Sequence, residues 1–137
     1  KLFCSEAFDV LEDAIINEKH DLLPYGAMLS GIGFGNASTT LGHALSYVFS
    51  NEGVPHGYAL SACTTLAHRF NKSIYYERFK KICQKLKFEP LKLKLDLDEA
   101  AEVILPDKGH LDNNPVSVTK QDIVKCLDEI VNSNPLT

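Results

Sequence analysis

The chain has 137 residues, a length that fits one domain with a single hydrophobic core. Hydrophobic residues make up 45% of it, which argues against intrinsic disorder, and the formal net charge of -4 gives no electrostatic reason to expect a nucleic-acid partner. No apolar run approaches the roughly 18 residues of a membrane span, and no secretory signal opens the sequence, so we expect a cytoplasmic protein without a membrane partner.

The periodicity of the chain is mostly helical, because apolar residues recur at intervals of three and four. We expect helices over residues 2–17, 22–35, 39–51, 55–70, 72–86, 96–105 and 119–133. Short connections between them favour neighbouring, roughly antiparallel packing, so the predicted fold is an all-α multi-helix bundle. Residues 2–16 already show helical spacing with no start signal before them, which indicates a fragment cut within or just before a helix.

Several residues have the types that begin or end helices. Ser38 or Thr39 can cap the third expected helix, because a hydroxyl accepts a hydrogen bond from the free amides of the first turn. Gly53 suits the left-handed position that ends this helix, and Pro55 suits the first position of the next. Near the end of the chain, Thr119 and Asp122 have the spacing of a capping box.

Two segments lie outside this helical pattern. Residues 91–98, LKLKLDLD, alternate apolar and polar side chains as a strand does, but a strand without a partner is not stable. We therefore interpret them as an extended connector with leucines on the core, and a short strand stays the alternative. Residues 107–118 are rich in turn-forming residues and are predicted to be a loop.

Cysteine usage favours a reducing compartment, since the four cysteines are scattered and form no CxxC pair. The simplest interpretation is four reduced, mostly buried thiols. They are Cys4, Cys63, Cys83 and Cys126.

Two histidines form the one constellation that suggests chemistry. His43 lies within an apolar helical run, and His56 follows Pro55 at the start of the next run. Neutral imidazole is a common ligand of zinc, iron and copper, so the pair is a candidate metal site. Tyr47 lies one turn after His43 on the same helix face and could donate a proton, stack on a flat ligand or simply pack against its neighbours. Histidines at this spacing are, however, more often ordinary core or surface residues.

Other candidates are weaker. The run Gly31–Gly35, GIGFG, is not a dinucleotide-binding GxGxxG, and it favours close helix packing. His68 beside Arg69 is typical of a solvated helix end, while His20 and His110 lie in turns and are expected to be exposed.

Two segments resemble the iron-containing alcohol dehydrogenases. Residues 31–71, GIGFGNASTTLGHALSYVFSNEGVPHGYALSACTTLAHRFN, are similar to the second signature of that family. Residues 112–127, DNNPVSVTKQDIVKCL, resemble its usual C-terminal end. The resemblance implies that residues 1–137 are a single helical metal-site domain, the C-terminal part of an enzyme whose NAD(P)-binding α/β domain and first metal-ligand helix are not in this sequence.

The same resemblance implies roles for individual residues. His43 and His56 match two metal ligands, and the other two, an Asp and a His one turn apart, have no match here, since the sequence contains no Asp-x-x-x-His. Tyr47 takes a place near the nicotinamide where the family often has histidine, so it is both the catalytic and the cofactor-binding candidate. The implied cofactors are a divalent metal, iron or possibly zinc, and NAD or NADP.

The implied function is hydride transfer between a small alcohol or aldehyde and the nicotinamide cofactor, with this chain inactive on its own. Loss of a covering domain would leave an apolar face exposed, so a homo-oligomer is also expected. A non-catalytic helical interaction or dimerisation module, and a related glycerol dehydrogenase or dehydroquinate synthase-like domain, stay open as alternatives.

Overall fold

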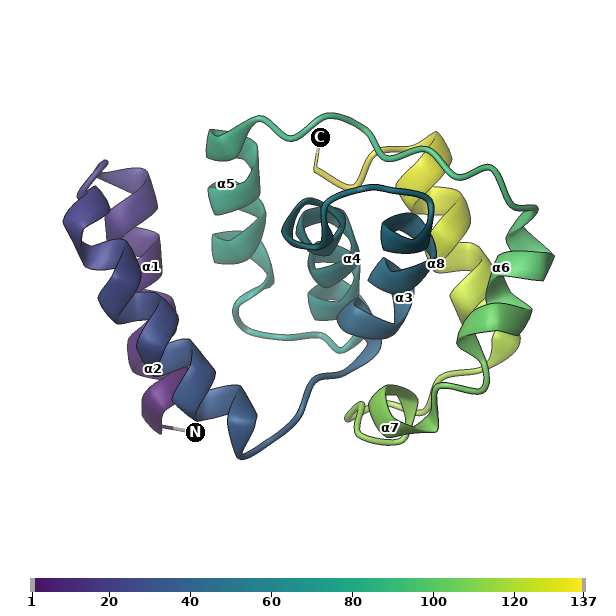
Figure 1. Cartoon of the computed structure of the whole chain (residues 1–137), viewed down its shortest axis with the longest axis horizontal. Helices are drawn as coiled ribbons and strands as arrows, with labels where there is room; N and C mark the ends of the chain where they lie inside the picture. Colours follow the sequence, from purple (N-terminus) through teal and green to yellow (C-terminus); the bar gives the residue numbers. More distant parts are fainter. Residues whose placement is uncertain (1, 137) are drawn as a thin grey trace. The chain divides into compact units, whose positions relative to one another are not determined.

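The computed structural model describes residues 2–136, and all regular structure within them is helical (Figure 1). The elements are α1 (Leu2–Ile16), the 3-10 turn η1 (His20–Leu22), α2 (Leu23–Gly35), α3 (Leu41–Asn51), α4 (His56–Phe70), α5 (Tyr76–Leu86), α6 (Leu97–Ile104), α7 (Lys108–Leu111) and α8 (Lys120–Asn132). The predicted all-α class is confirmed. None of the described helices is long and apolar enough to cross a membrane.

The chain divides into two compact units, Lys1–Ser38 and Thr39–Thr137. In the smaller unit α1 packs along α2 through small residues. A Cβ atom on Gly33 would lie 2.4 Å from the Cys4 sulfur, which explains why the GIGFG run needs glycine at this position. The expected apolar stripe of α1 is only partly buried, since Ala7 and Ala14 are covered whereas Leu2 and Phe3 are exposed.

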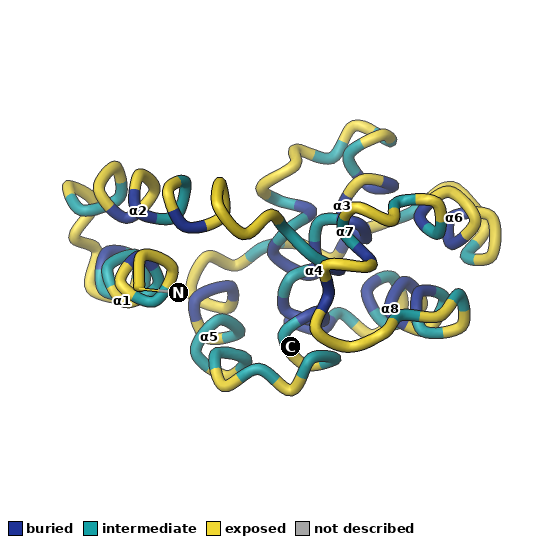
Figure 2. The backbone as a smooth tube through the Cα atoms, turned by 90° about the horizontal axis from the view of Figure 1, so that it is seen from below, coloured by how far each residue is buried: buried dark blue, intermediate teal, exposed yellow. Residues whose placement is uncertain are grey.

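The core of the larger unit forms around the helical pair α3 and α4, which α6 and α8 help to cover (Figure 2). The two helices approach closely at Gly42, where a Cβ atom would lie 2.9 Å from Thr64 Oγ1. Leu45 and Phe49 on α3 and Leu66 on α4 are almost fully buried in this core. This packing fixes the corner between α3 and α4.

The turn between these two helices follows the sequence signals closely. Gly53 has a φ of 97°, the left-handed conformation that a side chain would strain. The Val54 amide then donates to the Phe49 carbonyl and closes the helix end. Pro55 is the residue before α4 and not its first helical residue, so His56 begins the helix.

The caps were predicted correctly at one helix and wrongly at another. Thr119 and Asp122 form both hydrogen bonds of the expected capping box at α8. At α3, in contrast, the residue before the helix is Thr40, whose side chain forms no capping hydrogen bond. Ser38 cannot cap α3 because the helix begins three residues later, and its own backbone is left-handed, with a φ of 61°.

The segment between α5 and α6 is an extended connector, as expected, and no strand occurs within residues 2–136. Its leucine pattern contributes Leu91, which is buried in the core. The Glu52 carboxylate accepts hydrogen bonds from the amides of Lys94 and Leu95, and the Tyr58 hydroxyl accepts one from the Glu89 amide. These contacts replace the strand partner that the connector lacks.

The prediction that residues 107–118 form only a loop is wrong, because α7 interrupts this segment. The short helix packs against α3 and buries Leu111 in the core. The thiols behave nearly as expected: all four are free, and Cys63, Cys83 and Cys126 are buried, whereas Cys4 is exposed.

Candidate metal centre

The corner between α3 and α4 brings two imidazole rings together. His43 is the third residue of α3, and His56 is the first residue of α4. Their ring centroids lie 5.5 Å apart with an angle of 60° between the ring planes. The convergence that the sequence suggested is present in the structure, while the role of these rings as metal ligands stays a prediction.

Tyr47 lies beside this pair, one helical turn after His43. Its ring stacks on that of His56, with centroids 5.7 Å apart and an angle of 13° between the planes. The side chain is 39% exposed, which makes it more accessible than the core residues of α3. A flat, partly exposed ring next to the two imidazoles could contact a planar ligand.

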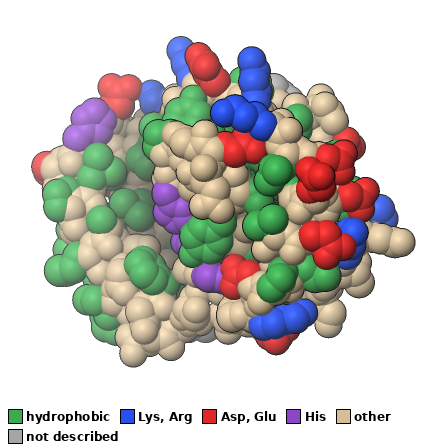
Figure 3. Space-filling model, turned by 45° about the vertical axis from the view of Figure 1, so that its right-hand side comes forward, with side chains coloured by type: hydrophobic (Ala, Val, Ile, Leu, Met, Phe, Trp, Pro, Cys, Tyr) green, Lys and Arg blue, Asp and Glu red, His purple; other side chains and the backbone are tan. Residues whose placement is uncertain are grey.

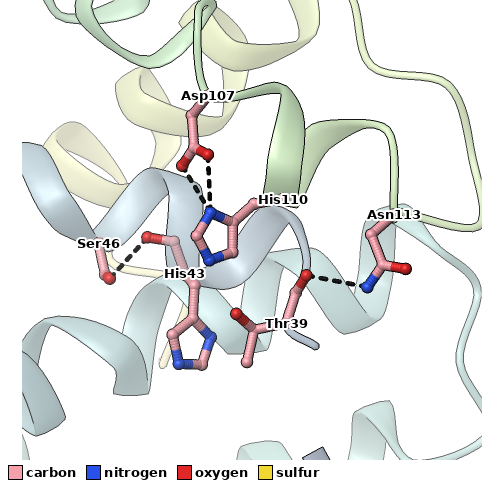
Figure 4. A network of polar contacts seen from close by, with 6 residues as sticks. All are labelled: Thr39, His43, Ser46, Asp107, His110 and Asn113. Carbon is pink, nitrogen blue, oxygen red and sulfur yellow. Dashed lines mark hydrogen bonds and ion pairs between the residues drawn. The ribbon is translucent and has the colours of Figure 1, made fainter. Parts of the chain in front are cut away.

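A third histidine joins the cluster, which sequence reasoning missed. His110 was expected to be exposed in a turn, but it lies on α7, and its side chain retains only 22% of its accessible surface. Its ring is parallel to that of His43, with centroids 6.1 Å apart (Figure 4). The centroid of the Tyr47 ring lies 5.5 Å from that of His110. Both carboxylate oxygens of Asp107 lie within 2.8 Å of its Nδ1 atom. The Asp-x-x-His spacing at residues 107–110 was the only signal in the sequence.

The surroundings keep His43 neutral. Burial, with smaller contributions from the nearby imidazoles of His56 and His110, holds the pKa of His43 below its ordinary value of 6.5. Burial removes water that would solvate a protonated ring, and a second positive charge nearby would repel it. At neutral pH, His43 therefore offers a lone pair, which is the form that binds a metal ion.

His56 is oriented by a hydroxyl group. Its Nδ1 atom lies 3.4 Å from Ser50 Oγ, which leaves Nε2 available for another partner. Ligating histidines in metalloproteins commonly use their second ring nitrogen for such a contact. Cys63, which the helical wheel places on the same side of α4, does not supply a thiolate, because it is buried and burial raises the pKa of its thiol far above the usual range.

A cavity of about 410 Å³ adjoins His43. A volume of this size is typical of small-molecule sites. None of the residues that line it carries a fixed charge, so it suits an uncharged polar molecule. They are Thr40, Gly42, His43, Thr64, Ala67, His68, Asn71, Ser73 and Pro115.

One of these residues corrects an expectation, since His68 is half-buried and not a solvated helix end. Its ring contacts that of Phe79, with centroids 5.1 Å apart, and burial lowers its pKa from the ordinary value of 6.5. His68 therefore binds a proton more readily in the unfolded chain than in the folded protein. Its contribution to folding stability is present above about pH 6.5 and is lost as the pH falls through the lower pKa that His68 has in the folded protein.

We therefore expect the free energy of unfolding to decrease less in His68→Gln than in the wild type between about pH 7 and pH 5. Urea denaturation at a series of pH values measures this difference. His20→Gln is the control, because His20 is exposed in η1 and should leave the pH dependence as it is. Parallel pH profiles for the wild type and His68→Gln would contradict the expectation.

The residues present fit part of a metal site. Two imidazoles with centroids 5.5 Å apart can both reach one ion, given nitrogen–metal distances of about 2.1 Å. A zinc or iron ion also takes further ligands. Within residues 2–136, however, no group of three or more His, Cys, Asp or Glu side chains has the geometry to hold a metal ion. A metal ion held by His43 and His56 would therefore need further ligands from outside the described residues.

The GIGFG run does not fit the pyrophosphate of a nicotinamide dinucleotide. Pyrophosphate groups bind to free backbone amides at a glycine-rich turn before a helix. The GIGFG run lies inside α2, where the helix itself uses the backbone amides. The GIGFG run therefore has no free backbone amides to bind a pyrophosphate.

The surface near the histidine side chains carries both hydrophobic and charged groups. Figure 3 shows histidine side chains reaching the surface beside hydrophobic ones near the middle of the face drawn, and an acidic side chain lies next to one of them.

Comparison with known families gives one match. Residues 5–104 match the Fe-containing alcohol dehydrogenase family, C-terminal. Neither the curated proteins nor the solved structures gave a match. The matched span is well over half of the chain and includes His43, Tyr47 and His56, whereas Asp107 and His110 lie beyond it. The chain therefore belongs to the Fe-containing alcohol dehydrogenase family and corresponds to the C-terminal part of that family's enzymes.

Proposed function

We propose that this chain forms part of the metal site of a cytoplasmic, NAD(P)-linked alcohol dehydrogenase, which transfers a hydride between a small alcohol or aldehyde and the nicotinamide. The observation that supports the proposal best is the convergence of His43 and His56 at the α3–α4 corner, inside the span that matches the family. The uncharged cavity beside His43 is consistent with an uncharged substrate.

In this proposal His43 and His56 would hold a divalent ion, iron or zinc, through ring nitrogens. When bound, such an ion supplies Lewis acidity that polarises a hydroxyl or carbonyl oxygen. The contact between Ser50 Oγ and His56 Nδ1 would leave Nε2 of His56 free to hold the ion, and burial keeps the pKa of His43 below its ordinary value. The buried side of α3 anchors the corner and keeps the two rings at a fixed separation.

Tyr47 is proposed to flank the reacting centre and to contact the nicotinamide ring. Its exposed aromatic face, stacked beside His56, supports this role. The remaining metal ligands and the binding site for the cofactor phosphates are assigned to a part of the enzyme other than the described residues, and the isolated chain is expected to have no turnover.

The proposal is tested by turnover assays on the protein at its natural length, with 1-propanol and propanal, both nicotinamide cofactors and added Fe²⁺ or Zn²⁺. We expect turnover in the wild type and a loss of about 1,000-fold or more in His56→Ala, since removal of a metal ligand removes the Lewis acid as well. His20→Ala should retain wild-type turnover. Metal-independent turnover that His56→Ala retains would contradict the proposal.

One alternative also has an observation in its favour. The helices of the smaller unit expose several large hydrophobic side chains, which favours a surface for self-association. They include Tyr25, Met28 and Phe34 on α2. A natural-length protein that turned over neither substrate but formed stable oligomers would favour a non-catalytic interaction module over the dehydrogenase.

A further inference from the structure

The pair Asp107 and His110 has a geometry that defines which ring nitrogen carries the proton. The Nδ1 atom of His110 lies 2.8 and 2.7 Å from the two carboxylate oxygens of Asp107. An ionised carboxylate only accepts hydrogen bonds, so Nδ1 must be the donor. In the neutral ring, Nε2 then carries the lone pair and acts as an acceptor.

The free nitrogen of His110 lies on the side of its ring that faces His43 (Figure 4). The parallel ring of His43 and the edge-on ring of Tyr47 are both within 6.1 Å, measured between centroids. Among the residues that the structure describes, none forms a hydrogen bond with His110 Nε2, with the His43 ring or with the Tyr47 hydroxyl. His110 from α7 and His43 and Tyr47 from α3 therefore bring together polar groups that are still able to hydrogen-bond to a ligand.

We propose that His110 is a substrate-binding residue, whose Nε2 accepts a hydrogen bond from the hydroxyl group of an alcohol at the His43–His56 corner. Asp107 is the positioning residue, because its carboxylate holds the ring in the tautomer that presents an acceptor. This inference rests on the proposed dehydrogenase function, and it adds a specificity element from α7. An alcohol carries the O–H donor that Nε2 requires, whereas an aldehyde does not.

The tautomer is measured first, by long-range ¹H–¹⁵N NMR of the histidine rings in the natural-length protein near neutral pH. We expect His110 as the Nδ1–H tautomer in the wild type and the Nε2–H tautomer in Asp107→Ala. Asp112→Ala is the matched control, since Asp112 is an exposed aspartate at the other end of α7. An Nε2–H tautomer of His110 in the wild type would overturn the inference.

Ligand binding is then followed in the same spectra, with Zn²⁺ and 1-propanol as the probes. We expect 1-propanol to shift the His110 Nε2 signal and Zn²⁺ to shift those of His43 and His56. If Zn²⁺ leaves His43 and His56 unchanged, the proposed dehydrogenase function fails. The 1-propanol response still decides the His110 assignment in that case: a shifted Nε2 signal supports it, and an unshifted one overturns it.

Kinetics give a third readout that a purely structural role would not produce. The variant His110→Phe keeps a flat ring but has no acceptor. In this variant KM for 1-propanol should rise about tenfold, because the alcohol loses its hydrogen bond to Nε2. KM for propanal should change little, because the aldehyde has no O–H group to donate. His110→Gln, whose amide oxygen can accept, should recover part of the loss. Equal increases of KM for both substrates would contradict the inference.

Discussion

Replacing either His43 or His56 by alanine is expected to lower the affinity of the natural-length protein for Zn²⁺ or Fe²⁺ by about 100-fold or more. Loss of an outer-shell partner alone costs about 10- to 100-fold in metal affinity, and a direct ligand contributes more than an outer-shell group. The two rings converge at 5.5 Å, and burial keeps His43 in the neutral form that binds a metal. Competition with a chelator of known affinity measures the change.

A double-variant cycle distinguishes one shared ion from two separate sites. If both imidazoles bind the same ion, each single variant has already lost the shared site. The double variant should then bind metal only slightly more weakly than the single variant with the lower affinity. Independent sites would give additive losses. His20→Ala serves as the control, since His20 lies in η1 and is exposed. Unchanged affinity in both single variants would exclude His43 and His56 as ligands.

The second large effect concerns the packing that holds the corner in place. Phe49 is fully buried in the last turns of α3, in the same core as Leu45 and Leu66. Phe49→Ala should lower the free energy of unfolding by about 3–5 kcal/mol, because both the transfer free energy of the ring and a cavity penalty are lost. This is a large part of the roughly 5–15 kcal/mol of a typical domain.

Urea denaturation of Phe49→Ala and of a matched surface variant checks this expectation. Phe34 on α2 is 51% exposed, so Phe34→Ala should change the free energy of unfolding by about 1 kcal/mol or less. Because α3 also carries His43 and Tyr47, Phe49→Ala should weaken metal binding too, whereas Phe34→Ala should not. Equal destabilisation by the two substitutions would mean that Phe49 does not anchor the core.

The helices and several helix ends could be predicted from the sequence, because they depend on residues that are close together in the chain. Helical periodicity identified the seven longer helices, and Gly53 and the Thr119–Asp122 box marked ends that the structure confirms, because a left-handed residue and a capping box depend on near neighbours. The convergence of His43 and His56 was also accessible, since a tight turn between two packed helices leaves the residues that flank it few places to lie.

Long-range packing explains what sequence reasoning missed. His110 belongs to a four-residue helix in a turn-rich segment, where no periodicity is long enough to detect, and only the packing of α7 on α3 places its ring beside His43. His68 was misjudged for a similar reason: its neighbour Arg69 indicated solvent, but contact with Phe79 of α5 buries the ring. Neither contact has a counterpart within a few residues in the chain.

Anomalous X-ray diffraction from crystals of the Zn²⁺-loaded, natural-length protein tests most directly whether the α3–α4 corner is a metal site. We predict one peak at the zinc edge within about 2.1 Å of a ring nitrogen of His43 and of a ring nitrogen of His56. A zinc peak that touches neither ring, or full zinc occupancy at another site with both imidazoles uncoordinated, would contradict it.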